Sequence, residues 1–275
     1  MNNSSASLYL ELLKKTLCYS LWDEPPISLE KYNYRRSFLK RFIVRTSTKI
    51  LKNFNLNIVK NQKFSPSDLK EGKVWPSQAT TMIGIKRLDN LQYCIEQVLS
   101  DKIPGDFIET GVWRGGACIF MSGVLSAYNV INRKIFVADS FQGIPLPDDD
   151  YPIDQSNNWH KEKYLSVSLD EVIENFRKYD LLSEQVFFLE GFFKNTLPNA
   201  KIDCLSILRL DGDLYSSTYE SLEYLYPKLS VGGYCIIDDY SLDNCMMAVN
   251  DYRNKNGIGD ELLEIDWTGR FWRKV

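Results

Sequence analysis

Residues 106–116 have the sequence DFIETGVWRGG, a short apolar run that ends in an acid and passes into a turn with three glycines. Four further apolar runs end in an acid or a glycine: 134–139 (KIFVAD), 186–191 (VFFLEG), 204–211 (CLSILRLD) and 233–239 (GYCIIDD). Helical periodicity between such runs is typical of a parallel sheet covered by helices. We therefore expect an α/β fold with a doubly wound, mostly parallel sheet and helices on both faces.

The helices between these runs have recognisable boundaries. Ser168 followed by Glu171 forms a capping box and predicts a helix that runs through residues 175–179 (NFRKY). A second helix is expected after Ser217, with apolar residues at helical spacing at Tyr219, Leu222, Leu225, Tyr226 and Leu229. At the C-terminus, LLEID, a WTG turn and RFWRKV predict an antiparallel hairpin at the edge of the sheet.

The first part of the chain differs in character from the rest. Leu8, Leu12, Leu13 and Leu17 predict a short amphipathic helix, and residues 35–52 are basic with scattered apolar side chains. This basic segment is compatible with a solvated helix, or with a helix that binds a membrane surface or a partner. We divide the chain into an N-terminal helical extension, residues 1–79, and a catalytic domain, residues 80–275.

The composition indicates which partners the chain suits. Its 33 Lys and Arg against 36 Asp and Glu give a net charge of -3, which does not favour nucleic acid as a partner. The six cysteines form no CxxC pair and lie mostly in apolar runs, as expected of reduced thiols in the cytoplasm. The N-terminal residues have neither the pattern of a secretory signal nor that of a membrane span. A small-molecule substrate fits best, and the chain could act as a monomer or a homo-oligomer.

Polar residues at the ends of the first two strands indicate a nucleoside site, because ligands of open α/β sheets bind beyond the carboxyl ends of the strands. Gly111, Gly115 and Gly116 would let the backbone approach a ligand, and Asp139 could accept hydrogen bonds from both hydroxyls of a ribose. The loop lacks the G-x-G-x-x-G fingerprint of dinucleotide sites. Adenosine without a diphosphate suits this loop, and S-adenosylmethionine is the common ligand of that kind.

A second group of acids ends the fourth and fifth strands. Asp211, Asp238 and Asp239 offer the hard oxygen ligands that Mg²⁺ takes. Asp238 and Asp239 can share one ion only if the chain turns there, because adjacent residues of a regular strand point to opposite faces. The alternative is structural, with one acid capping the next helix and another paired with Lys or Arg.

Several blocks of the sequence resemble the macrocin O-methyltransferase family, which methylates deoxysugar hydroxyls of tylosin-, mycinamicin- and novobiocin-type antibiotics. The most specific combination is RLDGDLY and GGYCIIDDY with ETGVWRGG. Other matching blocks are LYLELLKKTL, TMIGIKRLDNLQ, VADSFQGIPLPD, VSLDEVIENF, GFFKNTLP and IDWTGRFWRK. The resemblance covers nearly all of the chain from Thr80 and a short N-terminal helix, and it implies a class I methyltransferase-like fold.

The resemblance also implies roles for individual residues. Asp211 would be the general base and a metal ligand, with Asp238 and Asp239 completing the metal site. The residues implied at the cofactor are Thr81, Met82, Ile83, Gly84, Glu109, Thr110, Gly111, Val112, Gly115, Asp139, Ser140, Gly191 and Phe192. Thr80 stands where the family has a histidine, and His160, the only histidine, lies in a loop where it is either near the acceptor or simply on the surface.

These expectations combine into one function, methyl transfer from S-adenosylmethionine to a sugar hydroxyl of a glycosylated natural product or glycoconjugate with help from Mg²⁺. Two alternatives remain open at this point. A catechol-type O-methyltransferase would use a similar metal site on a flat aromatic diol. A non-catalytic, partner-binding protein would keep the fold and use the basic N-terminal segment as its contact surface.

Overall fold

One seven-stranded sheet forms the centre of the computed structural model, which describes residues 4–28 and 38–275. The strand order is β5-β4-β3-β6-β7-β9-β8. The strands are β3 (Asp106–Thr110), β4 (Ile135–Asp139), β5 (Val186–Glu190), β6 (Leu205–Leu210), β7 (Leu229–Ile237), β8 (Leu263–Glu264) and β9 (Arg270–Arg273). Strands β3 to β7 pair in parallel, and β9 pairs antiparallel with β7 and β8. The five predicted strands and the C-terminal hairpin are thus confirmed.

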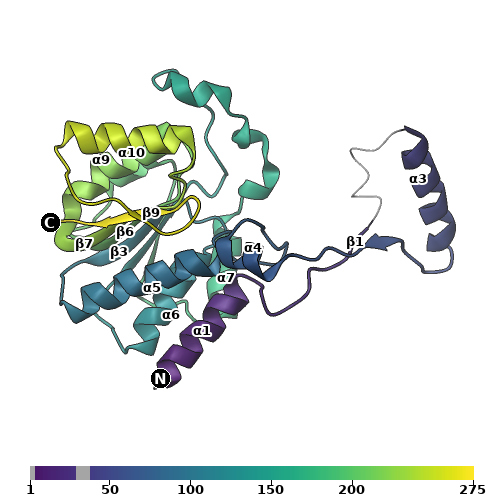
Figure 1. Ribbon diagram of the computed structural model, residues 1–275, viewed down its shortest axis with the longest axis horizontal. Helices are drawn as coiled ribbons and strands as arrows, with labels where there is room; N and C mark the ends of the chain where they lie inside the picture. The colour runs from purple at the N-terminus through teal and green to yellow at the C-terminus, as the bar shows by residue number, and fades with distance from the viewer. Residues whose placement is uncertain (1–3, 29–37) are drawn as a thin grey trace.

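Helices cover both faces of this sheet, as the alternating pattern predicts (Figure 1). One apolar cluster joins the sheet to α5 and α6, and a second joins its other face to α9 and α10. The helices are α1 (Ser5–Leu17), α3 (Phe38–Lys52), α4 (Pro66–Glu71), α5 (Ile85–Ser100), α6 (Gly116–Ala127), α7 (Leu169–Lys178), α8 (Phe193–Thr196), α9 (Tyr215–Leu225) and α10 (Asp243–Lys255). Among the described residues, no helix is long and apolar enough to cross a membrane.

Two predicted helix details need correction. In α1 the buried leucines are Leu10, Leu13 and Leu17, whereas Leu8 and Leu12 are more than half exposed. The buried side packs on α6, where Leu13 fills the space left by the absent side chain of Gly123. At α7 the N-cap half of the predicted capping box is confirmed, since the Ser168 hydroxyl accepts from the Glu171 N–H at 3.2 Å. The Glu171 carboxylate contacts Arg114 at 3.7 Å.

The helix predicted after Ser217 begins and ends earlier than expected. Helix α9 already starts at Tyr215, and it stops at Leu225. Tyr226 lies in a short 3₁₀ turn with Pro227, and Leu229 is the first residue of β7. Pro227 lacks the backbone N–H that a continuing helix needs, so the helix ends before it. The apolar residues at helical spacing continue beyond this end, which is why the spacing alone predicted a longer helix.

A segment between α1 and α4 extends away from the body of the molecule (Figure 1). It contains the strand β1 (Ile27–Ser28), which pairs antiparallel with β2 (Val59–Lys60), and the helix α3. This two-stranded sheet is separate from the seven-stranded sheet. Part of the basic segment predicted at residues 35–52 therefore forms a helix, while residues 35–37 lie outside the described residues.

Candidate active site

A cavity of about 380 Å³ opens at the carboxyl ends of the parallel strands. Its walls come from the loops after β3, β4, β5 and β6 and from α9, which is where ligands of open α/β sheets bind. The predicted site residues that line it are Thr81, Met82, Glu109, Gly111, Val112, Asp139, Ser140, Phe192 and Asp211. The sequence reasoning missed the lining residues Trp113, Gly143, Ile144, Pro145, Leu146, Asp148, Leu165, Phe193, Lys194, Asn195, Gly212, Asp213, Ser216, Ser217 and Glu220.

Gly111 brings two of these loops together. Its φ of +86° favours glycine, and a Cβ atom added there would collide with the backbone carbonyl of Asp211. The backbone N–H of Asp211 also donates to the Thr110 carbonyl at 2.8 Å. The loop after β3 and the loop after β6 therefore touch, which places Glu109 and Asp211 in one wall of the cavity.

Asp139 ties the loops after β3 and β4 to each other. One carboxylate oxygen accepts from the N–H of Val112 and the other from the N–H of Phe141, both at 2.8 Å. Burial raises the pKa of Asp139, and these backbone donors oppose that rise. The Ser140 hydroxyl also donates to Oδ1, at 3.4 Å, and a carboxylate offers about four lone-pair sites in all. Asp139 can thus hold the loops and still accept a hydroxyl from a ligand in the cavity.

A buried arginine sits at the centre of the acidic group. Arg209 is 1% exposed and lies beside Glu109 in the parallel register of β3 and β6. Its guanidinium forms ion pairs with Glu109, with Asp238 and, at 2.9 Å, with Oδ2 of Asp211. Burial raises the pKa of Glu109 to about 7, and the charge of Arg209 opposes that rise. Three carboxylates from three strand ends are therefore held around one cation.

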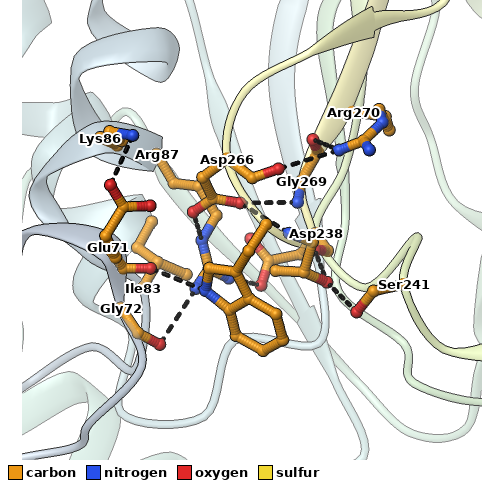
Figure 2. A network of polar contacts seen from close by, with 12 residues as sticks. Glu71, Gly72, Ile83, Lys86, Arg87, Asp238, Ser241, Asp266, Gly269 and Arg270 are labelled. Carbon is orange, nitrogen blue, oxygen red and sulfur yellow. Dashed lines mark hydrogen bonds and ion pairs between the residues drawn. The ribbon is translucent and has the colours of Figure 1, made fainter. Parts of the chain in front are cut away.

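A second arginine reaches the same acids from α5, and Figure 2 shows its network. Arg87 pairs with Asp238 and, at 3.0 Å, with Asp266 from the turn before β9. Asp238 consequently has one oxygen on Arg209 and the other on Arg87. The structural alternative considered for the three acids thus holds for Asp238, which is ion-paired on both sides.

Asp211 and Asp239 differ from Asp238 in their surroundings. Strand β7 ends at Ile237, so Asp238 and Asp239 lie in the turn that a shared ion requires, and ligand atoms of all three acids lie within 4.8 Å of one another. Oδ2 of Asp239 is buried and has no hydrogen-bond partner in the described part of the chain. Burial, Asp213 and Asp211 together raise the pKa of Asp239 well above its ordinary value. This corner therefore holds more carboxyl groups than Arg87 and Arg209 pair with.

The remaining predicted residues lie outside the cavity lining. Gly84 precedes α5 and packs against the backbone of Gly72, Ile83 is buried in the core, and Gly191 contacts Thr196. Thr110 and Gly115 belong to the same loop as the lining residues Gly111 and Val112 without lining the cavity themselves. Thr110 and Gly115 can therefore affect a bound cofactor only indirectly, by shaping the loop that contacts it.

Thr80, which stands where the family has a histidine, and His160 also lie outside the cavity lining. The Thr80 hydroxyl bonds with Tyr179 at 3.1 Å and lies 3.4 Å from the Leu17 carbonyl, so it joins α1 to the end of α7. His160 is half-buried in a 3₁₀ turn, and its Nδ1 has no partner among the described residues. Neither residue lines the cavity.

Asp154 anchors the long segment between β4 and α7 over the site. This buried carboxylate accepts from the N–H groups of Tyr215 and Ser216, at 2.9 and 3.0 Å, and from the Asn244 amide at 2.7 Å. Acids are favourable at helix N-termini, and these donors begin α9. Ile144, Pro145 and Leu146, from the same segment, give the cavity an apolar wall.

Comparison with known proteins gives consistent matches over the whole chain. The family described as Macrocin-O-methyltransferase (TylF) matches residues 6–274. Demethyldecarbamoylnovobiocin O-methyltransferase of Streptomyces niveus is 47% identical over 99% of this chain and 95% of its own. The 8-demethyl-8-(2,3-dimethoxy-alpha-L-rhamnosyl)-tetracenomycin-C 4'-O-methyltransferase of Streptomyces olivaceus is 44% identical over 99% and 95%. The solved structure of the O-methyltransferase NovP superposes with a TM-score of 0.84 at 45% identity, covering 98% of this chain and all of that one.

Proposed function

Because the chain belongs to the macrocin O-methyltransferase family, we propose that it transfers a methyl group from S-adenosylmethionine to a sugar hydroxyl of a glycosylated small molecule, with a divalent cation, Mg²⁺, at its acidic corner. Membership makes the chain an O-methyltransferase. The observation that carries the finer proposal is the cavity itself, which has a nucleoside-type wall at Asp139 and an acidic wall at Asp211 and Asp213.

The cofactor half of the proposal rests on the loops after β3 and β4. Gly111 and Val112 line the cavity, and the buried carboxylate of Asp139 provides a hydrogen-bond acceptor beside them. Trp113 and the apolar residues Ile144 and Leu146 offer surface for a flat ring. An adenosine with its ribose at Asp139 would have its sulfonium in the same cavity as Glu109 and Asp211, which both line it.

The metal half of the proposal rests on the fit of the acidic corner to a hard cation. Asp239 carries an unpartnered buried oxygen, and Asp211 offers the oxygen that does not face Arg209. Asp238 is the weaker ligand of the three because both of its oxygens already face arginine. A bound Mg²⁺ would lower the pKa of a coordinated hydroxyl and stabilise its negative charge.

The protein's own residues would position and deprotonate the acceptor. Asp211 lines the cavity, and its pairing with Arg209 fixes the direction of its carboxylate. A carboxylate held at this point can take the proton of a hydroxyl that stands in line with the methyl carbon and sulfur. Asp213 lines the same wall and is the second carboxylate that could take this proton.

A sugar acceptor is favoured over a catechol because one relative is named as a 4'-O-methyltransferase of a rhamnosyl tetracenomycin. Lys194, Asn195 and Glu220 also give the outer cavity polar groups suited to several hydroxyls. Retention of the acids and the cofactor loop argues against a purely partner-binding role.

Calorimetry and a paired assay test the proposal. S-adenosylmethionine should bind the isolated protein with one site per chain, and a deoxysugar glycoside should be methylated while a catechol is not. Chelator should abolish turnover in folded protein, and added Mg²⁺ should restore it. Turnover of the catechol alone would assign the other substrate class, and full turnover after exhaustive chelation would remove the metal from the proposal.

A further inference from the structure

The turn before β9, residues 266–269 (DWTG) and called the C-terminal turn below, lies outside the cavity lining and contacts the acidic corner from behind (Figure 2). No step of the proposed mechanism uses this turn. Its side chains Asp266 and Thr268 are nevertheless buried, at 2% and 3% exposure. Buried polar groups in proteins have hydrogen-bond partners, and the partners of these two lead to the acids of the site.

Asp266 divides its two oxygens between the turn and an arginine. Its Oδ1 accepts from the N–H groups of Thr268 and Gly269, at 3.0 and 2.7 Å. Its Oδ2 accepts from Nε of Arg87 at 3.0 Å, and Nη1 of the same guanidinium donates to Asp238. Because a guanidinium is planar and its donors have fixed directions, Arg87 relates the position of Asp238 to that of the C-terminal turn.

Thr268 holds the same aspartate by its backbone. Its hydroxyl donates to the Asp238 carbonyl at 3.0 Å and accepts from the Ser241 hydroxyl at 2.8 Å. On the other side, the Asp238 N–H donates to the Leu210 carbonyl at 2.9 Å. The N–H, the carbonyl and both carboxylate oxygens of Asp238 are therefore all bound, and the residue has one defined orientation.

Asp239 follows directly, and its direction depends on how Asp238 is held. Strand β7 has already ended at Ile237, and the Asp239 carbonyl accepts from the Leu242 N–H at 2.8 Å in the turn before α10. In the described part of the chain, Oδ2 of Asp239 has no hydrogen-bond partner that could orient it. The backbone on either side therefore sets where this carboxylate points, and Asp238 is the residue before it.

Arg87 is itself confined by closely packed backbone. Its Nη2 lies 3.5 Å from the Gly72 carbonyl, and a Cβ atom added to Gly72 would lie 2.5 Å from the same nitrogen. A Cβ atom added to Gly269 would lie 3.3 Å from Cδ of Arg87. The guanidinium thus has room for one position, and the acids on its two sides are held at a fixed separation.

Stability alone does not account for this arrangement. Removing charged groups from water costs free energy that their mutual attraction often only offsets, and apolar side chains of similar volume can pack such a region at least as well. What a buried polar network does supply is direction, since hydrogen-bond partners behind a carboxylate orient the oxygens that bind a metal. The contacts of the C-terminal turn converge on Asp238, which begins the acidic corner.

We infer that Arg87, Asp266 and Thr268 are positioning residues, which hold Asp238 and Asp239 in the geometry that a divalent cation requires. This inference rests on the proposed function, from which the cation is taken. Loss of such outer partners typically weakens metal binding by about 10–100-fold. Thr268 gives the cleanest test, because its hydroxyl contacts the backbone of Asp238 and its replacement changes no charge.

Thermal unfolding over a Mg²⁺ titration tests the inference, because it measures ion binding without turnover. The Mg²⁺ concentration at which the melting temperature begins to rise should be about 10–100 times higher for Thr268→Val and Asp266→Asn than for the wild type. Thr268→Ser keeps the hydroxyl and should match the wild type. Thr16→Val is the matched control, since the Thr16 hydroxyl also donates to a backbone carbonyl, that of Leu13 at 2.8 Å, within α1.

The outcomes separate a positioning role from a structural one. Thr268→Val with a lower melting temperature in chelator and an unchanged Mg²⁺ titration would overturn the inference, as would equal loss of Mg²⁺ binding in Thr268→Ser. Because Thr268→Val removes only one hydroxyl, this comparison does not depend on the folding of Asp266→Asn. A wild-type protein that does not respond to Mg²⁺ would instead refute the metal in the proposed function, and this inference with it.

Discussion

Replacing Asp239 by Asn separates a metal ligand from a structural acid, because the two roles predict opposite effects on stability. The metal-free Asp239 carboxylate is buried beside other acids, with one oxygen unpartnered. Its raised pKa means that the folded state binds its proton more tightly than the unfolded state does. Stability is therefore lost as the pH rises from about 4 through the raised native pKa, and at neutral pH the ionised group destabilises the metal-free protein.

The magnitude follows from the environment of the side chain. Asn keeps a polar group at this position but removes the buried charge beside the other acids, and each unit of pKa shift is worth about 1.4 kcal/mol, so Asp239→Asn should stabilise chelated protein by at least about 1 kcal/mol at neutral pH. For a chain of this size each kcal/mol raises the melting temperature by about 2–4 °C. The gain should disappear at about pH 4, where the unfolded-state carboxylate also becomes protonated.

Mg²⁺ should reverse the order of stability, so that wild-type protein becomes more stable than the Asp239→Asn variant. At one hundred times its dissociation constant, the ion should stabilise wild-type protein by about 2.7 kcal/mol and the variant by much less. Thermal unfolding with chelator and with Mg²⁺, run beside methyl transfer, makes the comparison, and Asp203→Asn serves as the control because Asp203 is exposed in the loop before β6. Destabilisation of the chelated variant, or equal stabilisation of both proteins by Mg²⁺, would refute the reasoning.

Three further substitutions address the rest of the site. Arg209→Met should lower the free energy of unfolding by about 3–5 kcal/mol in urea titrations, because it leaves three carboxylates without their central cation; a neutral effect would mean that the acids are protonated. Asp139→Ala should weaken S-adenosylmethionine binding more than tenfold by calorimetry, since each charged hydrogen bond is worth about 1.5–3 kcal/mol, whereas an unchanged dissociation constant would place the ribose elsewhere. Asp211→Asn should reduce turnover by about 10²–10⁴, with partial recovery at high pH if Asp211 is the base; wild-type turnover at neutral pH would exclude it.

The sheet could be predicted from the sequence because each strand is a short apolar run that ends in a glycine or an acid. The helix boundaries were less accurate where the apolar spacing and the backbone disagree, as at Tyr226 and Leu229, which continue the spacing of α9 beyond Pro227. In α1 the sequence offered leucines on several sides, and the packing against α6 selects Leu10 rather than Leu8.

The candidate site was predictable where residues stand at strand ends, and not where they meet through the register of the sheet. Arg209 lies inside an apolar strand with no local sign of its role, and it reaches Glu109 only because β3 and β6 pair residue against residue. Arg87 meets Asp238 across 151 positions of sequence. The lining residues Ile144 and Leu146 come from an irregular segment whose course depends on the contacts of Asp154.

The most direct test of the central claim is to locate the transferred methyl group. The protein would be incubated with Mg²⁺, S-adenosylmethionine carrying a trideuterated methyl group, and an antibiotic glycoside with a free deoxysugar hydroxyl, and the product would be fragmented in a mass spectrometer. The account predicts one trideuterated methyl group on the sugar fragment, and none when chelator replaces Mg²⁺. Label on the aglycone, or no transfer to any glycoside by a protein that binds the cofactor, would contradict it.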